Sequence, residues 1–207
     1  MDLITASKVV LGTFSASTAT TYLICTIFNI PFFNPKHNRY QFYYNLKQVS
    51  ISTAIALTQS VLISSIFVNR WIKNEPHTIF QSIDNIIRYS IIAEFIYYIY
   101  HRTIHTREYY KKVHAMHHEN VDVYPFDTFY MTKMDSLFLV GSLGAPIVFL
   151  NLNYYELVFT LYVYITAAYL EHSNIFFIDH HAIHHKLIFC NYCILNPMFD
   201  ILFGTYR

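Results

Sequence analysis

Histidine is the residue whose placement first suggests chemistry in this sequence. Ten of the twelve histidines lie between His101 and His185, and eight of these ten fall into three tight clusters. The clusters have the patterns H-x3-H, H-x2-H-H and H-x2-H-H, and they are His101 and His105, then His114, His117 and His118, then His181, His184 and His185. His172 stands alone before the third cluster, which His180 directly precedes. Because neutral imidazole is the commonest protein ligand for transition metals, these clusters indicate a metal centre.

The spacing within each cluster suits a site built from helices. Residues three or four apart share one helix face, so we expect each cluster to aim two or three imidazoles at one place. With His172, the candidate ligands number nine, which exceeds the four of a closed zinc site and favours two metal ions. Nearby acids are expected to accept hydrogen bonds from the ring N–H groups. The candidates are Glu94, Glu119, Asp122, Asp135, Glu171, Asp179 and Asp200.

Three histidines and the three cysteines have other interpretations. His37 and His77 lie in expected loops far from the clusters, and we predict ordinary roles for them. His180 lies four residues before His184, so it is either a further ligand or a neighbour of one. A single C-x2-C without a second pair argues against a zinc knuckle, and reduced thiols are expected. The cysteines are Cys25, Cys190 and Cys193.

The composition is that of a membrane protein. Hydrophobic residues make up 54% of the chain and charged residues 13%, about half the charged share of a soluble domain. The 19 tyrosines and 18 phenylalanines suit the membrane interface. A net charge of +1 gives no reason to expect nucleic acid as a partner. A buried helical core in a soluble protein is the alternative, but too few charged residues are available to coat it.

We predict an all-α integral membrane helical bundle of four to five spans with a cytosolic, histidine-rich helical cap. Pro146 is expected to kink the fourth span, and a short link suggests that the fourth and fifth form a hairpin. Both are short, so a shallow or re-entrant pair stays open. The third span contains Arg88 and Glu94 and is expected to start near Ile79. The predicted spans are Val9–Ile30, Val49–Val68, Ile86–Tyr100, Ser136–Leu152 and Tyr154–Leu170.

The distribution of lysine and arginine sets the expected orientation. Cations are concentrated between Pro31 and Gln48 and after Tyr100, so the positive-inside rule puts the histidine region in the cytosol. A signal peptide is the alternative for the first span, but its length and the lack of a small-residue cleavage site favour a retained anchor. We expect residues 1–78 to form the N-terminal membrane spans and residues 79–207 the catalytic domain.

Several motifs together resemble one known family. Their order is H-R-x2-H, K-x-x-H-x-x-H-H, E-H-S-N, H-x2-H-H followed by N-Y, and a terminal D-x-L-F-G-T-Y-R. This order, which runs from Glu94 to Arg207, resembles the fatty acid hydroxylase/sterol desaturase superfamily of membrane di-iron oxygenases. The resemblance implies a lipid hydroxylase or desaturase that uses O₂ and two iron ions, with zinc an alternative occupant after isolation. It gives ligand roles to His101, His105, His114, His117, His118, His172, His181, His184 and His185.

The resemblance also implies where the protein acts and with what. A sterol or fatty-acyl lipid is the expected substrate, and an endoplasmic-reticulum type of membrane is expected in a eukaryotic host. The sequence lacks the H-P-G-G motif of a fused cytochrome-b5-type domain and the G-x-G-x-x-G of a dinucleotide site. We therefore expect an external electron donor of the cytochrome-b5/reductase type.

Two departures from the family pattern leave alternatives open. Many relatives carry a further histidine in an H-P-x-E stretch, where this chain reads Tyr130 to Asp135. Some carry a second histidine after the lone ligand, where this chain has Phe176. Either His180, a carboxylate or water completes the metal cluster, or this member of the family has altered or weak activity. The rival functions are a membrane metal-binding protein and a catalytically silent member of the family.

Overall fold

Helices are the regular secondary structure of the described part of the chain. The computed structural model describes residues 2–73, 75–173, 175 and 179–207, and an isolated bridge between Lys73 and Asn153 is the strand-like pairing found there. The prediction of an all-α fold is therefore confirmed. The bundle is formed by the long helices α1 (Leu3–Ile27), α2 (Arg39–Trp71), α3 (Ile79–Ile104), α5 (Lys133–Gly144) and α7 (Tyr154–Glu171), with the four-residue α6 (Pro146–Phe149) directly after α5. The short elements are α4 (Arg107–Val113), η1 (His117–Glu119), η2 (Pro125–Phe129), α8 (His180–Leu187) and α9 (Met198–Leu202).

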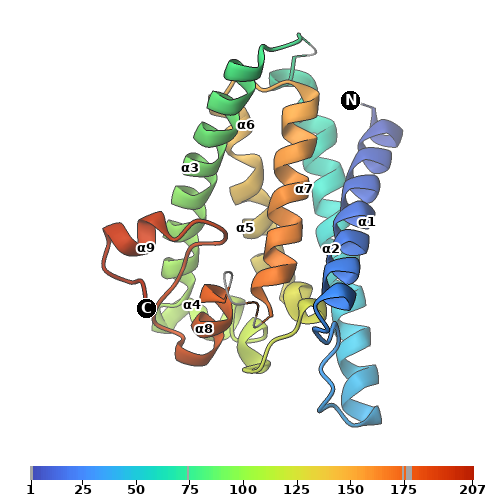
Figure 1. Cartoon of the computed structure of the whole chain (residues 1–207), viewed down its shortest axis with the longest axis vertical. Helices are drawn as coiled ribbons and strands as arrows, with labels where there is room; N and C mark the ends of the chain where they lie inside the picture. The colour runs from blue at the N-terminus through green and yellow to red at the C-terminus, as the bar shows by residue number, and fades with distance from the viewer. Residues whose placement is uncertain (1, 74, 174, 176–178) are drawn as a thin grey trace.

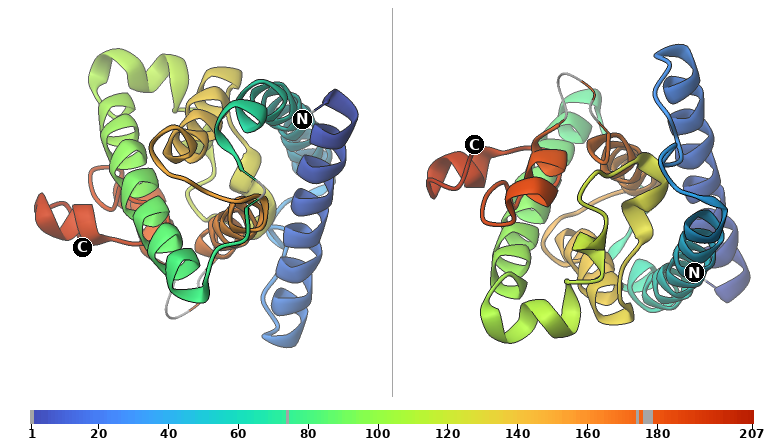
Figure 2. Two further views of the ribbon diagram at one scale, coloured as in Figure 1. Left: turned by 90° about the horizontal axis from the view of Figure 1, so that it is seen from above. Right: turned by 90° about the horizontal axis from the view of Figure 1, so that it is seen from below.

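The long helices run side by side, and the short ones gather at one end of this bundle (Figure 1). α1 lies along α7 and α2, while α5 lies between α2 and α3. Seen along the bundle axis, these helices surround a common interior, and α9 stands outside against α3 (Figure 2). α4 and α8 lie together where α3 and α7 end, so the bundle positions the histidine clusters at that end.

Local sequence signals explain where the helices start and break. Capping boxes begin α2, α3 and α7, where an Asn or Thr side chain and a Gln or Glu three residues later each bond the other's backbone N–H. The predicted interruption at Pro146 is confirmed, because α5 ends at Gly144 and α6 starts at the proline. The third predicted span does start at Ile79.

Among the described residues, two helices are long and apolar enough to cross a membrane. They are Leu3–Ile27 and Arg39–Val68, and only 17% of the apolar window of each is buried, whereas the core helix of a soluble protein would be mostly buried. Large apolar side chains such as Leu23, Leu62 and Ile66 are exposed on them. This supports a membrane protein. The count of four to five spans is not confirmed, because α3 carries charged residues and α5 has only 12 residues.

The serines and threonines of α1 serve two purposes. The hydroxyls of Thr18, Thr21 and Thr26 bond back to carbonyls four residues earlier, so they are satisfied within an apolar helix. Ser17 also donates to the carbonyl of Tyr162 at 3.3 Å. The bond from Ser17 fastens α1 to α7, the helix that leads to His172.

A buried carboxylate joins the elements at the opposite end of the bundle. Glu156 lies in the first turn of α7 and accepts hydrogen bonds from Ser82 at 2.7 Å, Asn85 at 3.0 Å and the backbone N–H of Asn153 at 3.0 Å. The Nδ1 atom of His77 lies 2.8 Å from its Oε1. Glu156 therefore fixes the start of α3 against the start of α7.

Replacing Glu156 by alanine is expected to destabilise the bundle. The change leaves one buried and several partly buried polar groups without their partner, at a cost of up to about 1–3 kcal/mol each. We expect the thermal unfolding midpoint in detergent to fall by several degrees, measured by circular dichroism. Glu75→Ala, at an exposed position in the preceding loop, is the control and should leave the midpoint unchanged. Equal midpoints for the two variants would contradict this role.

Candidate metal centre

The short helices bring the histidine clusters together at one end of the bundle. α3 supplies the first cluster at its C-terminus, and the turn between α4 and η1 supplies the second. α8 carries the third, and His172 directly follows α7. All the rings are buried except that of His105, which is half-buried.

The nine predicted ligands converge in two groups. Within each group, one ring nitrogen of every histidine lies within 4.8 Å of those of the others. The five-histidine site comprises His101, His105, His114, His118 and His184. The four-histidine site comprises His117, His172, His181 and His185. The nine histidines that the sequence singled out therefore lie together, and the structure divides them between two positions.

The expectation that each cluster aims two or three imidazoles at one place is confirmed for two histidines of each cluster, but the third member of the second and of the third cluster belongs to the other site. His184 belongs to the five-histidine site, whereas His181 and His185 belong to the four-histidine site. Successive residues of an α-helix point about 100° apart, so α8 faces both sites at once. The second cluster is divided in the same way, because His117 and His118 point to different sites from η1.

Hydrogen bonds fix which nitrogen carries the proton in six of the rings. The Nδ1 atom of His114 lies 2.6 Å from a carboxylate oxygen of Asp135. In five others, Nδ1 lies 2.6–3.2 Å from a backbone carbonyl oxygen. Carbonyl and ionised carboxylate oxygens only accept, so Nδ1 donates and Nε2 holds a lone pair. The five are His101, His117, His172, His184 and His185.

These Nε2 lone pairs face one another. The Nε2 atoms of His101 and His114 are 3.0 Å apart, and that of His117 lies 3.1 Å from His185 and 3.4 Å from His172. Facing lone pairs repel unless a cation or a proton lies between them. Burial lowers the pKa of His172 to about 3 and holds the pKa of His114 well below its ordinary value, which disfavours the proton. Metal ions are the cations that remain.

Three further rings have nitrogens that need a partner. Within the described residues, neither nitrogen of His105 or His181 is hydrogen-bonded, nor is Nδ1 of His118. Leaving a buried polar atom unpaired costs about 1–3 kcal/mol, and coordination to a metal would remove this cost for one nitrogen of each ring. The residues therefore fit metal ions, and imidazole without thiolate suits iron, zinc, copper or nickel.

Asp135 is the acid that contacts a candidate ligand directly. One of its oxygens accepts from Nδ1 of His114, and the other accepts from the hydroxyl of Tyr100. Thr132 caps the helix turn that holds Asp135. In this stretch, where many relatives have a further histidine, the chain therefore supplies a carboxylate that orients a ligand.

Two other predicted acids contact the backbone segment that orients the rings and not the rings themselves. Glu94 and Asp200 are buried and accept backbone N–H groups from the segment 190–196 at 2.8–3.0 Å. That segment supplies the carbonyls that accept from Nδ1 of His101 and His184. The two carboxylates therefore hold the chain that orients two rings of the five-histidine site.

His180, whose role the sequence left open, belongs to neither group. Its Nε2 lies 3.7 Å from a carboxylate oxygen of Glu171, and its carbonyl accepts from Asn191. It is therefore a neighbour of the candidate ligands. Phe176 lies outside the described residues.

The remaining predicted partners lie apart from the rings. Asp122 pairs with Lys36 at the surface at 2.8 Å, and Glu119 accepts from the hydroxyl of Tyr130. Asp179 precedes α8 and makes no side-chain cap there. The three cysteines are buried free thiols, as predicted. The carbonyl acceptors were missed because every residue has a carbonyl and no sequence signal marks these ones.

Comparisons with known proteins are consistent with this geometry. A family model described as fatty acid hydroxylase matches residues 86–205. A very-long-chain aldehyde decarbonylase GL1-11 from Oryza sativa is 30% identical over 145 residues, which cover 59% of this chain and 52% of the relative. Methylsterol monooxygenase erg25B from Aspergillus fumigatus is 26% identical over 133 residues, which cover 56% and 45%. The chain thus spans about half the length of these relatives. No solved structure gives a significant match.

Asp135→Asn is expected to weaken metal binding. The amide keeps the size of the carboxylate but loses the charge that orients and polarises the ring of His114, and losing such a partner typically costs about 10–100-fold in metal affinity. The measurement is a competition titration against a chelator with the purified chain. Asp122→Asn, at the surface, is the control and should bind as the unaltered chain does. Unchanged affinity in Asp135→Asn would count against the assignment.

The metal-free protein is expected to lose stability in mild acid. Burial lowers the pKa of His105 to about 2 and of His172 to about 3, so both stay neutral when folded but take up protons below about pH 6.5 when unfolded. At pH 5 each such histidine favours unfolding by on the order of 2 kcal/mol. We expect the thermal midpoint to fall between pH 7.5 and pH 5, and added metal should oppose the fall. A flat profile without metal would show that the rings are not buried as described.

Proposed function

Because the chain belongs to the fatty acid hydroxylase family, we propose that it is a membrane oxidoreductase that uses O₂ to hydroxylate or desaturate a lipid. The single observation that carries this proposal is the pair of buried histidine groups whose Nε2 lone pairs face one another. We propose that the five-histidine site and the four-histidine site each hold one iron ion, with zinc an alternative occupant after isolation. The nine histidines are then the metal ligands.

The proposed division of labour follows from what side chains can do. Bound iron supplies the activation of O₂ and the oxidising power that an aliphatic C–H bond requires and that no side chain has. The imidazoles hold their Nε2 atoms toward the two positions because carbonyls and Asp135 bind their Nδ1–H groups. Their burial keeps the rings neutral and keeps bulk water from the centre.

The membrane and the relatives suggest the substrate class. α1 and α2 suit a bilayer, and we propose an apolar lipid with a sterol or fatty-acyl skeleton. The relatives are named for a very-long-chain aldehyde and a methylsterol, and both are such lipids. Analysis of the lipid products distinguishes hydroxylation from desaturation.

We further propose residues 1–78 as the membrane-anchoring part and residues 79–207 as the catalytic part. Exposed cations, among them Arg107, Lys111 and Lys112, surround the end that carries the histidines, which supports a cytosolic location for it. An external donor of the cytochrome-b5/reductase type would deliver electrons there. In a eukaryotic host the membrane would be of the endoplasmic-reticulum type.

Expression in a host that lacks sterol and acyl hydroxylation tests the function. Lipid mass spectrometry should find products that have gained one oxygen or lost two hydrogens. His117→Ala and His184→Ala, one in each site, should lose most bound metal and all turnover, while His37→Ala serves as the control. Full turnover in His184→Ala would contradict the two-metal centre. Metal binding without any lipid change would favour a metal-binding or catalytically silent member instead.

A further inference from the structure

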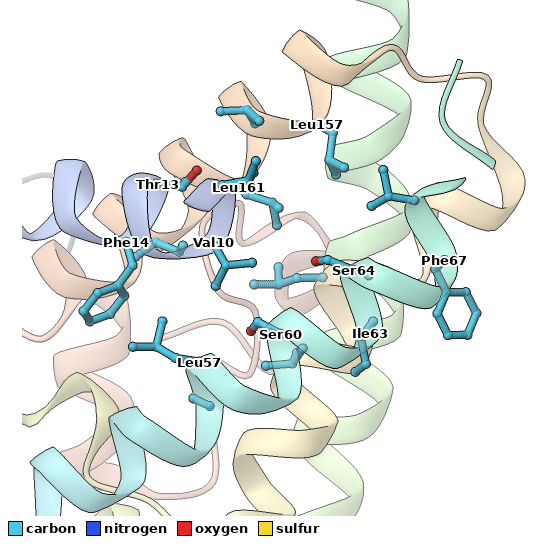
Figure 3. A pocket seen from close by; sticks show the side chains of 18 of the residues that line it. Val10, Thr13, Phe14, Leu57, Ser60, Ile63, Ser64, Phe67, Leu157 and Leu161 are labelled. Atoms are coloured by element: carbon cyan, nitrogen blue, oxygen red, sulfur yellow. The ribbon is translucent and has the colours of Figure 1, made fainter. Parts of the chain in front are cut away.

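An apolar cavity of about 120 Å³ lies between α1, α2, α5 and α7 (Figure 3). Val10, Leu57 and Leu161 point into it from three helices, and Ser60 and Ser64 are small residues on the α2 side. The described residues that line it include several hydroxyls and no charged side chain. It therefore offers nothing to bind a charged group and suits an apolar one.

The cavity ends next to the segment that supports the metal centre. Phe129 lines the cavity, and the carbonyl of the next residue, Tyr130, accepts from Nδ1 of His117. On α5, Leu139 lines the cavity one helical turn after Asp135. The stretch from residue 129 to residue 139 thus both lines the cavity and supports the candidate metal centre. This shared stretch connects the two features.

The spacing of residues along α7 gives the distance between the cavity and the candidate metal centre. Ile165 is the last residue of α7 that lines the cavity, and His172 lies seven residues further along the chain. At about 1.5 Å per residue, the two are about 10 Å apart along the helix. Phe129, which lines the cavity, packs against Tyr169 of α7, with ring centroids 5.4 Å apart.

We propose that this cavity binds part of the aliphatic chain of the lipid substrate, a proposal that rests on the function proposed above. A cavity of about 150 Å³ lined by aliphatic and aromatic side chains stays dry and holds benzene, so this one holds a few methylene groups rather than a whole lipid. Since it lies about 10 Å from His172, the carbons it holds are not the ones that react. It therefore sets how far the end of the chain lies from the centre.

Photoaffinity labelling tests binding without requiring turnover. The probe is hexadecanol that carries a diazirine at the chain end, added to the full chain in detergent. We expect labelled peptides from α2 and α7 that include cavity residues, with the labelling competed by unlabelled hexadecanol. Ser64→Phe fills the cavity and should reduce this labelling about tenfold, which corresponds to about 1.4 kcal/mol of binding free energy. Ser60→Phe should do the same.

Ser50→Phe is the matched control, because Ser50 is exposed on the same helix and does not line the cavity. It should be labelled as the unaltered chain is. Bound metal, measured in every preparation, shows that each variant is folded. Labelling confined to outward-facing positions such as Ile66, or equal labelling in folded Ser64→Phe, would overturn the cavity site.

The two proposals fail in different ways. Competed labelling of the cavity in a chain that changes no lipid would leave the binding site standing and refute the oxygenase. Turnover of lipids without labelling of the cavity would support the oxygenase and refute the binding site. Where turnover is found, Ser64→Phe should shift the product distribution toward shorter chains, and an unchanged distribution would contradict the role of the cavity.

Discussion

The repulsion between buried imidazole lone pairs is the constraint on which the rest of this structure depends. Six rings donate their Nδ1–H groups outward, so their Nε2 atoms are left without protons and are directed toward shared positions. Burial makes protonation costly there, as the lowered pKa of His172 shows. Bound cations would make this arrangement favourable, and on the proposed function the fold of this end of the bundle and metal binding depend on one another.

This constraint explains the surroundings of the centre. In the proposed centre, neutral ligands would leave the charge of two metal ions uncompensated, and Asp135 is the described carboxylate that contacts a candidate ligand. Glu94 and Asp200 bind backbone N–H groups instead, so they fix the segment 190–196 in position. Polar groups thus gather at one end of the bundle, while the cavity between α1, α2, α5 and α7 stays apolar.

The sequence indicated which residues come together at the candidate site better than it indicated how they are arranged there. The helical bundle, the break at Pro146 and the convergence of nine histidines follow from composition, proline chemistry and spacing. Their division into two groups does not, because it depends on α8 lying between the two positions and facing both. The partner of His114 was not predictable either, since seven acids were candidates and only the tertiary fold places Asp135 beside it. The span count depends on lipid contacts, which hydropathy alone does not define for α3 and α5.

X-ray absorption spectroscopy of the purified, iron-loaded full chain, together with its metal content, tests the central claim most directly. The two histidine sites predict two iron ions per chain, surrounded by nitrogen and oxygen ligands with the outer scattering typical of imidazole. Sulfur should be absent from the ligands, although the chain contains three cysteines. A single iron ion per folded chain, or a sulfur ligand, would contradict the account.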